Sequence, residues 1–358
     1  MSFGSIFNIS NINTLPKDNT TSLNIVPRSS LICLGQKHQA LPFAADVIVY
    51  TYTGSGIMKK LWFAITTEPE TTFLYITVDG NVTFGNTSTS TEEIGLNTIG
   101  LSCDLALGAG RGNTVNFNTT TIGSNNGSNG YIGGFFALDI PFSSSVSINL
   151  NNTVTSGLYW IQPFIQTNPS IPISLSSLQL HCDTFKYGPT VYNSEYPLLN
   201  CRGNGNGVYL KGVKLYCRGI SGHWWESRIR MYSGGTGMNI VQPTATCYTD
   251  KTYKYSLPYQ TGATVLWTSS GFEDFFLSSD NFAGQATYFA NDAGLLYNTA
   301  GTKGVGPTDT ISVYRFFGVG SEVMPYSSSN LVVTFTSGDP QIGTSGVVDL
   351  IGQIYYYM

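Results

Sequence analysis

The sequence predicts an all-β protein built from two antiparallel β-sandwiches in tandem, a double jelly roll. Charged residues make up only 11% of the chain, too few for the charged outer faces of surface helices. The chain has 40 Gly, 22 Tyr and 20 Phe, a balance typical of aromatic-rich strands separated by turns. Its 358 residues exceed the usual size of one domain, so we expect two.

Six short runs in the first half are rich in β-branched and aromatic residues and predict strands. They are Asp46–Tyr52, Lys60–Ile65, Phe73–Val78, Phe135–Ile140, Ser145–Leu150 and Leu158–Phe164. Asp79-Gly80 follows the third run and predicts a tight hairpin turn. Residues from about 85 to 130 are rich in Gly, Asn, Ser and Thr, which predicts a long loop excursion from this sandwich.

A domain junction is predicted at Gln166–Ile173, because this segment contains two prolines and separates two series of strands. We therefore expect an N-terminal jelly roll over residues 1–170 and a C-terminal one over residues 171–358. The second series of strands comprises Ser174–His181, Gly207–Cys217, Trp224–Tyr232, Lys254–Leu257, Ala286–Phe289, Ile311–Phe317, Leu331–Thr336 and Val348–Tyr357. Each half has enough strands for a jelly roll of about eight.

The charge and cysteine patterns argue against several function classes. The 17 basic and 21 acidic residues form no basic stripe, so we expect no direct readout of nucleic acid. No apolar stretch is long enough to span a membrane, and Met1–Ile6 shows no sign of a signal peptide. The six cysteines form no Cys-x-x-Cys pair, so we expect no metal site, and nothing in the sequence requires a cofactor. Cys201 and Cys217 flank a glycine-rich turn, and the sequence leaves open whether they pair.

A surface with so little charge must consist largely of Ser, Thr and Asn. Such a surface suits contact with further copies of the chain or with carbohydrate better than the steering of charged ligands.

Three blocks in the second half occur in the order and spacing of a known family. Ser270–Phe276 is similar to the Gly-Thr-Glu-Asp-Tyr-Phe signature of glycoside hydrolase family 172. Ala293–Tyr297 and Ile311–Phe316 resemble the family's Ala-Gly-Leu and Tyr-Arg-Phe blocks. Weaker echoes begin at Gly54–Ile57 and include Phe136–Phe142, so the resemblance extends from Gly54 to the C-terminus.

The resemblance implies a pair of catalytic glutamates. Family members cleave α-fructofuranosides with retention, which needs two carboxyl groups about 5–5.5 Å apart. Glu273 matches one of the two glutamates, with Asp274 beside it. Glu226 stands where the family has Trp-Trp-Gly-Glu-Gly-Asp, but here the Gly before the glutamate is missing and Ser-Arg replaces the trailing Gly-Asp. On a strand, that one-residue shift would turn Glu226 to the opposite face.

The aromatic residues beside Glu226 are the implied sugar contacts. Trp224 or Trp225 would form the floor of the site, and His223 and Asp274 would complete it. Arg228 could hold Glu226 ionised, which would prevent it from acting as a general acid.

The resemblance also implies two classes of function. The family's double jelly roll is related to the major capsid proteins of icosahedral viruses and assembles through trimers. The altered Glu226 motif favours a virion structural protein, a trimeric capsid or capsid-associated subunit located in the virion, over an enzyme. The alternatives are a cytoplasmic retaining hydrolase of fructofuranosides and a carbohydrate-binding relative without catalysis.

Overall fold

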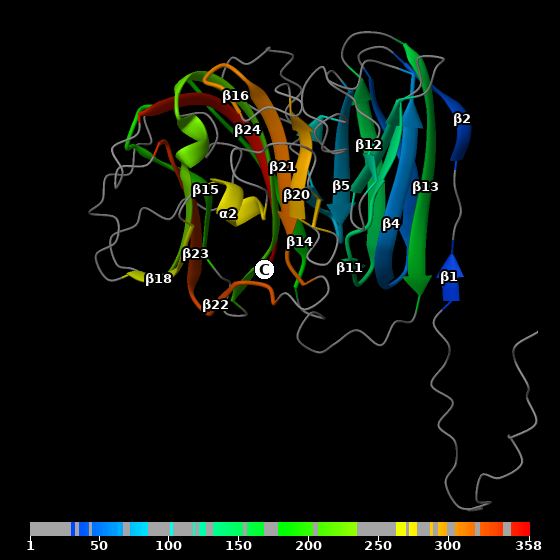
Figure 1. The fold of residues 1–358 in the computed structure, drawn as a ribbon. Coiled ribbons are helices and arrows are strands. Elements are labelled where there is room, and N and C mark those ends of the chain that lie inside the picture. The colour runs from blue at the N-terminus through cyan, green and yellow to red at the C-terminus, as the bar shows by residue number, and fades with distance from the viewer. Residues whose placement is uncertain are drawn as a thin grey trace, which may run out of the picture.

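The computed structural model describes residues 30–32, 36–42, 45–66, 72–84, 101–102, 117–118, 122–126, 132–152, 156–167, 178–202, 207–234, 263–269, 272–277, 287–288, 293–298, 305–318, 323–338 and 345–358. The described residues form strands almost throughout (Figure 1).

The strands of the first half precede residue 168 in the chain. They are β1 (Ser30–Ile32), β2 (Gln36–Leu41), β3 (Ala45–Thr53), β4 (Gly56–Ile65), β5 (Thr72–Val78), β6 (Asn81–Phe84), β7 (Leu101–Ser102), β8 (Phe117–Asn118), β9 (Ile122–Asn126), β10 (Ile132–Phe136), β11 (Ile140–Phe142), β12 (Ser145–Asn152) and β13 (Gly157–Thr167).

Within the described residues, the second half adds eleven strands and two short helical segments. They are β14 (Leu180–Tyr187), β15 (Glu195–Arg202), β16 (Val208–Gly222), the 3-10 turn η2 (Trp224–Glu226), β17 (Arg228–Gly234), β18 (Ala263–Thr268), α2 (Phe272–Phe276), β19 (Thr287–Tyr288), β20 (Ala293–Asn298), β21 (Thr310–Phe316), β22 (Tyr326–Ser327), β23 (Asn330–Thr336) and β24 (Gly346–Tyr357).

The first half forms a jelly roll. One sheet contains β1 and β2 beside β13, followed by β4 and β10. The other contains β3, β12, β5 and β6 in that order. If β1 and β2 count together as the first of eight strands, the two sheets have the orders 1-8-3-6 and 2-7-4-5, which is the jelly-roll arrangement.

The second half repeats this arrangement strand for strand. Its sheets have the orders β14-β24-β16-β21 and β15-β23-β17-β18, which are again 1-8-3-6 and 2-7-4-5. Each half also extends one sheet with the strand that precedes its sixth strand, β9 beside β10 and β20 beside β21. The predicted double jelly roll is therefore confirmed by the strand pairing.

A twelve-stranded sheet runs through both halves, because β14 lies beside β6 through the pairing of Cys182 with Phe84. Successive side chains of a strand point to opposite faces of the sheet. In β24, Tyr355 and Tyr357 belong to a first core with Leu61 and Ile76, whereas Tyr356 belongs to a second core. The eight-stranded sheet covers one face of this long sheet, and the four-stranded sheet covers the other (Figure 1).

The predicted strands agree with the structure except in three places and where they fall outside the described residues. Phe135–Ile140 was expected to be one strand, but β10 ends at Phe136 and β11 begins at Ile140. Of Ser174–His181, only Leu180 and His181 lie in a described strand, because β14 begins at Leu180. Trp224–Tyr232 was expected to be one strand, but its first three residues form η2, and β17 begins at Arg228. Lys254–Leu257 lies outside the described residues, as does most of the expected loop excursion apart from β7, β8 and β9. Residues 168–177 are outside them too, so the boundary at residue 170 stays a prediction.

Asp79 joins two turns of the first jelly roll. Asp79 and Gly80 both have positive φ, as the predicted hairpin turn requires. The Asp79 carboxylate accepts hydrogen bonds from the backbone N–H groups of Ser143, Ser144 and Ser145 at 2.7–3.1 Å. Partial burial raises the pKa of Asp79, but these bonds and the Ser144 hydroxyl outweigh that effect and lower the pKa to about 2.

We predict that Asp79→Asn lowers the free energy of unfolding at pH 7 by about 1–2 kcal/mol, since it removes charge-assisted hydrogen bonds. A carboxyl group whose pKa is lowered on folding stabilises the protein above its unfolded pKa, and this stabilisation is lost as the pH falls toward the folded value. The difference between wild type and variant should therefore shrink from about pH 4 toward pH 2.

Urea unfolding at several pH values measures this difference. Asp46→Asn on β3 is the matched control, because Asp46 is exposed. A pH-independent difference between Asp79→Asn and wild type would contradict the role given to the ionised carboxylate.

Candidate functional site

The segment predicted to contain one catalytic glutamate forms a turn between β16 and β17. The backbone N–H of Glu226 donates to the carbonyl of His223 at 3.1 Å, and that of Ser227 donates to Trp224 at 3.2 Å. The Ser227 hydroxyl donates to the same carbonyl of Trp224 and accepts from the N–H of Gly338, which ties the turn to the end of β23. Because Glu226 lies on a turn, its direction does not follow from strand alternation.

Trp224 is completely buried in the second core, and Trp225 is 7% exposed. The indole N–H of Trp224 donates to the carbonyl of Gly306 at 3.3 Å. A β-carbon on Gly346 would lie 2.5 Å from the Trp224 Cα, so this close approach of two backbones requires glycine. Trp224 therefore has no exposed ring on which a sugar could stack.

His223 is exposed, and its ring lies 4.9 Å from that of Trp225. Glu226 is half-buried. These two side chains are the parts of the turn that solvent reaches.

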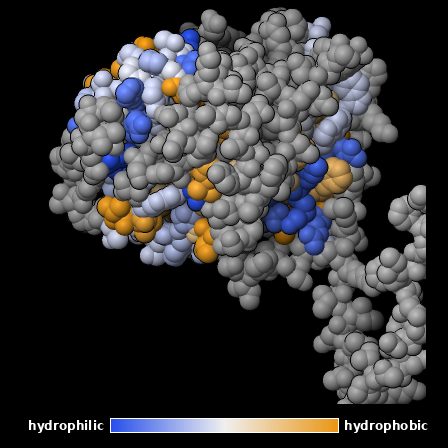
Figure 2. Space-filling model, viewed as in Figure 1, coloured by the Kyte–Doolittle hydropathy of each residue, from blue (hydrophilic) through white to orange (hydrophobic). Residues whose placement is uncertain are grey.

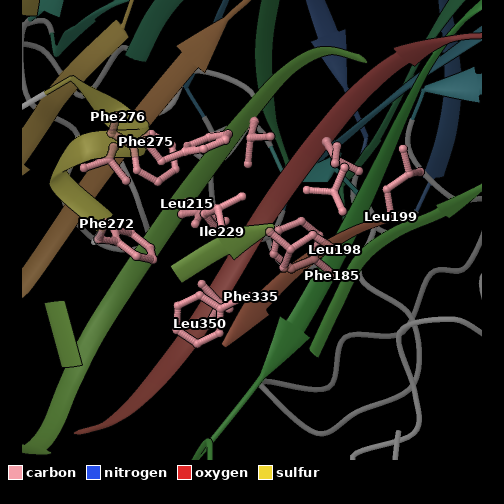
Figure 3. Packing of buried hydrophobic residues seen from close by; sticks show 14 of the residues in the cluster. Phe185, Leu198, Leu199, Leu215, Ile229, Phe272, Phe275, Phe276, Phe335 and Leu350 are labelled. Atoms are coloured by element: carbon pink, nitrogen blue, oxygen red, sulfur yellow. The ribbon is translucent and has the colours of Figure 1, made fainter. Parts of the chain in front are cut away.

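The second predicted motif lies next to this turn. α2 packs against η2, and Phe272, Phe275 and Phe276 of α2 are buried in the second core (Figure 3). The backbone thus brings the two motifs together from positions about 50 residues apart. The side chains of Glu273 and Asp274 lie outside the described residues, so the predicted carboxyl pair stays a prediction.

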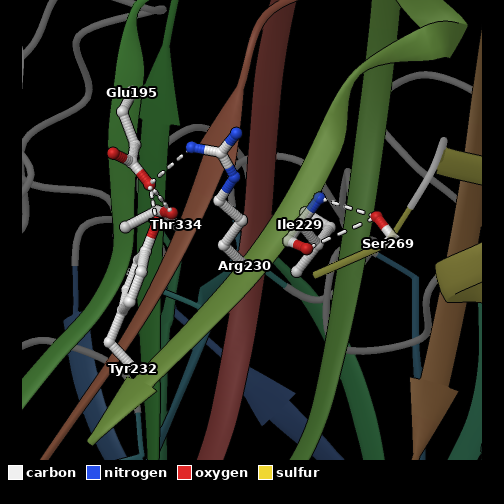
Figure 4. A network of polar contacts seen from close by, with 6 residues as sticks. All are labelled: Glu195, Ile229, Arg230, Tyr232, Ser269 and Thr334. Atoms are coloured by element: carbon white, nitrogen blue, oxygen red, sulfur yellow. Dashed lines mark hydrogen bonds and ion pairs between the residues drawn. The ribbon is translucent and has the colours of Figure 1, made fainter. Parts of the chain in front are cut away.

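Contacts just before α2 and within it hold this helix in place. Before the helix, Ser269 and Ile229 of β17 exchange hydrogen bonds, including Ile229 N–H to Ser269 Oγ at 3.0 Å (Figure 4). At the helix, Arg315 of β21 donates to the carbonyl of Phe275 at 2.5 Å. The Arg315 guanidinium also lies 4.7 Å from the Trp267 ring and 5.0 Å from the Phe317 ring.

Arg315 is only 7% exposed, so its cation is stabilised by ring faces and a carbonyl inside the sandwich. In the sequence, Arg315 stands out only as part of a Tyr-Arg-Phe block. An arginine in a run of apolar residues, Ile311–Phe317, is the signal that could have marked it as a buried cation.

A second buried polar cluster involves the four-stranded sheet (Figure 4). One carboxylate oxygen of Glu195, which is 3% exposed, accepts from the hydroxyl groups of Tyr232 at 2.8 Å and Thr334 at 2.5 Å. Arg230 lies 3.9 Å from the same oxygen. Burial, and then the charge of Glu195, raises the pKa of Tyr232 to about 12, so Tyr232 remains a donor at neutral pH.

None of the described cysteines is part of a disulfide. Cys182, Cys201 and Cys217 are buried thiols, which answers the question left open for Cys201 and Cys217. Cys201 Sγ instead lies 3.3 Å from Met358 Sδ. Burial raises the pKa of Cys217 well above its usual value, so its thiol stays protonated.

Among the described residues, no three His, Cys, Asp or Glu side chains gather as metal ligands would. None of the helices within those residues is long and apolar enough to cross a membrane.

Comparison with known proteins gives structural likenesses only. A scan against protein families finds no match for the chain, and a search of curated proteins finds none either. Among solved structures, the major capsid protein P2 from bacteriophage PM2 matches with a TM-score of 0.33 and 10% identity, over 86% of this chain and 97% of that one. The STIV MCP matches with a TM-score of 0.38 and 7% identity, over 92% and 97%. Both scores are low, so we take neither fold nor function from these two proteins.

We predict that Arg315→Lys lowers the free energy of unfolding by about 1–3 kcal/mol. Lysine keeps the charge but lacks the planar guanidinium that contacts ring faces and the Phe275 carbonyl together. The control is Arg218→Lys, the same change at an exposed arginine paired with Asp349, where we expect less than about 1 kcal/mol. Thermal or urea unfolding measures the loss of stability in each variant. Equal losses at the two positions would contradict the stabilising role given to the Arg315 guanidinium.

Proposed function

We propose that this chain is a structural subunit of a virus particle, a major capsid or capsid-associated protein that assembles with copies of itself as trimers and resides in the virion. One observation carries the proposal: a single sheet runs through two jelly rolls that have the same strand order. A shared central sheet with a core on each face resists relative movement of the two sandwiches, as a shell component must. We also propose the division into units at residue 170.

Jelly rolls serve viral capsids, lectins and cupins alike, so the fold alone does not select among these functions. The surface supports the capsid choice. In the view of Figure 2 small hydrophobic groups are scattered among hydrophilic ones over the coloured atoms. With charged residues at 11% of the chain, flanks packed against neighbouring subunits would leave few charges to desolvate.

The mechanism of such a subunit is geometric. Each sandwich would bury a flank against the next copy, and burial of apolar surface contributes about 25 cal/mol per Å². No catalysis or cofactor is involved, and contact with nucleic acid by base readout forms no part of the proposal.

The first test is self-association of the purified full chain. We expect native mass spectrometry and light scattering to give a particle of three times the chain mass, and electron microscopy to show trimers that pack into hexagonal arrays or shells. A stable monomer at concentrations up to about 100 µM, far above the Kd expected for a standard-size interface, would overturn the proposal.

A second candidate, a retaining hydrolase of fructofuranosides, is favoured by one observation, the position of α2 against η2. In that case Glu226 and Glu273 would be the nucleophile and the acid/base, with His223 and Asp274 in contact with the sugar. The burial of Trp224 and Trp225 weighs against it, because neither ring is presented as a sugar platform.

We predict that the wild-type chain releases no sugar from α-fructofuranosides above the level of the Glu226→Gln and Glu273→Gln variants. Chromatography of the reaction products provides the measurement. Sugar release by the wild type that falls at least 1,000-fold in both variants would establish the hydrolase instead. Sugar binding by calorimetry, equal in all three proteins and without release, would indicate the non-catalytic carbohydrate-binding alternative.

A further inference from the structure

On one face of the first jelly roll, the described side chains combine large rings with almost no charge. The side chains of β13 alternate cleanly, with Ile161 and Ile165 in the first core, so Trp160, Gln162 and Phe164 point to the outer face of the eight-stranded sheet. Register places Trp62 of β4 beside Gln162.

The neighbouring strand continues this surface. Phe135 of β10 pairs with Trp62, and Gly133 pairs with Ala64. A β-carbon on Gly133 would lie 3.4 Å from the Ala64 β-carbon and 3.9 Å from the Trp62 ring. Because Gly133 and Ala64 are both small, the surface beside the Trp62 indole is shallow. We call this surface the outer aromatic face and define it by Trp62, Phe135, Trp160, Gln162 and Phe164.

Charge is scarce among the described side chains of this face. The Lys60 ammonium lies 3.9 Å from the centre of the Phe135 ring, so its charge already has a partner in the chain. Tryptophan and phenylalanine are enriched in the buried centres of protein interfaces, where charged residues are depleted. The four rings are half-buried and Gln162 is exposed, so the rings are held in place by their own strands.

The sheet is large enough to supply most of the area of a subunit interface. Its path of six strands is about 29 Å wide at about 4.8 Å per strand, and the ten residues of β4 span about 33 Å. The six strands contain 3, 11, 10, 5, 5 and 2 residues, so their projected area is about 570 Å², against roughly 800 Å² per partner in a standard-size interface. A mono- or disaccharide would cover only a small part of it.

We propose that the outer aromatic face is the flank by which the first jelly roll packs against a second copy of this chain. This inference rests on the proposed function, since it names the surface through which the subunits associate. The eight-stranded and four-stranded sheets lie on opposite faces of the shared sheet. A contact from the first jelly roll of one copy to the second jelly roll of the next is head-to-tail, and it closes as a trimer when each copy is rotated by about 120° from the one before.

The test places a charge at the centre of the face. Gln162→Glu and Gln162→Arg each change an exposed side chain, so the fold should persist, and unfolding curves check that it does. The two new charges have opposite signs. An effect of burying a charge should therefore appear in both variants, whereas attraction to or repulsion from Lys60 would differ between them. We expect both variants to raise the Kd for self-association at least tenfold, because each leaves an unpaired charge at a desolvated site.

The matched controls lie on β3, at the far edge of the twelve-stranded sheet. Thr51→Glu adds the same charge at an exposed position, and Ile48→Glu removes the apolar side chain of a residue that is 64% exposed. We expect both controls to associate as the wild type does, as measured by native mass spectrometry and light scattering.

The outcomes separate this inference from the proposed function. If the wild type remains monomeric, both fail. If the wild type associates and both folded Gln162 variants associate equally well, the outer aromatic face is not the interface, but the proposed function stands. If Ile48→Glu alone blocks association, the interface lies at β3, and the inference is overturned.

Discussion

The structure depends on β24, a strand that supplies side chains to two hydrophobic cores at once. Val348, Leu350, Ile354 and Tyr356 point into the second core, and Tyr355 and Tyr357 point into the first. Each fully buried large side chain contributes roughly 1.5–3 kcal/mol, so neither sandwich can lose this strand and keep its core. The two jelly rolls are therefore parts of one body.

The join between the sandwiches is also made by specific hydrogen bonds. The Tyr357 hydroxyl donates to the carbonyl of Asp139 at 2.8 Å, which links β24 to the β10–β11 corner of the first jelly roll. Backbone bonds between Met358 and Gln179 in both directions fix the last residue beside the start of β14. Burial, and then the nearby Asp139, raises the pKa of Tyr357, so this hydroxyl stays protonated at neutral pH.

Buried polar groups distinguish the second jelly roll from a purely apolar sandwich. Arg315 lies among ring faces, and Glu195 is held by two hydroxyl groups and Arg230. Such groups are costly to bury unless they are hydrogen-bonded. The Arg315 contacts hold α2 on the shared sheet, and the Glu195 bonds connect β15, β17 and β23 of the four-stranded sheet. In a subunit of a shell, such fixed packing would serve assembly, because the flanks must present one shape to every neighbour.

The sequence by itself determined the fold class and most strands, because alternation in runs such as Leu158–Phe164 and turn residues such as Asp79-Gly80 act locally. It missed β1, β2, β15, β18, β20 and β22, and it predicted a loop where β7, β8 and β9 form, because short or irregular patterns become strands only through pairing with neighbours. It placed Trp224 on a strand and in a sugar site. In the structure the tryptophan is a core residue of a turn, since Gly346 lets the β24 backbone approach it closely.

Tertiary structure alone decided that the two halves share one sheet, that α2 meets η2, and that an arginine is buried among rings. These features join residues far apart in the chain, and no local pattern encodes which distant partner a strand or cation will find. The three tyrosines of β24, Tyr355–Tyr357, show most clearly the difference between local pattern and tertiary packing. Their β-propensity predicted a final strand, but only the packing of both sheets against β24 sends Tyr356 to one core and its two neighbours to the other.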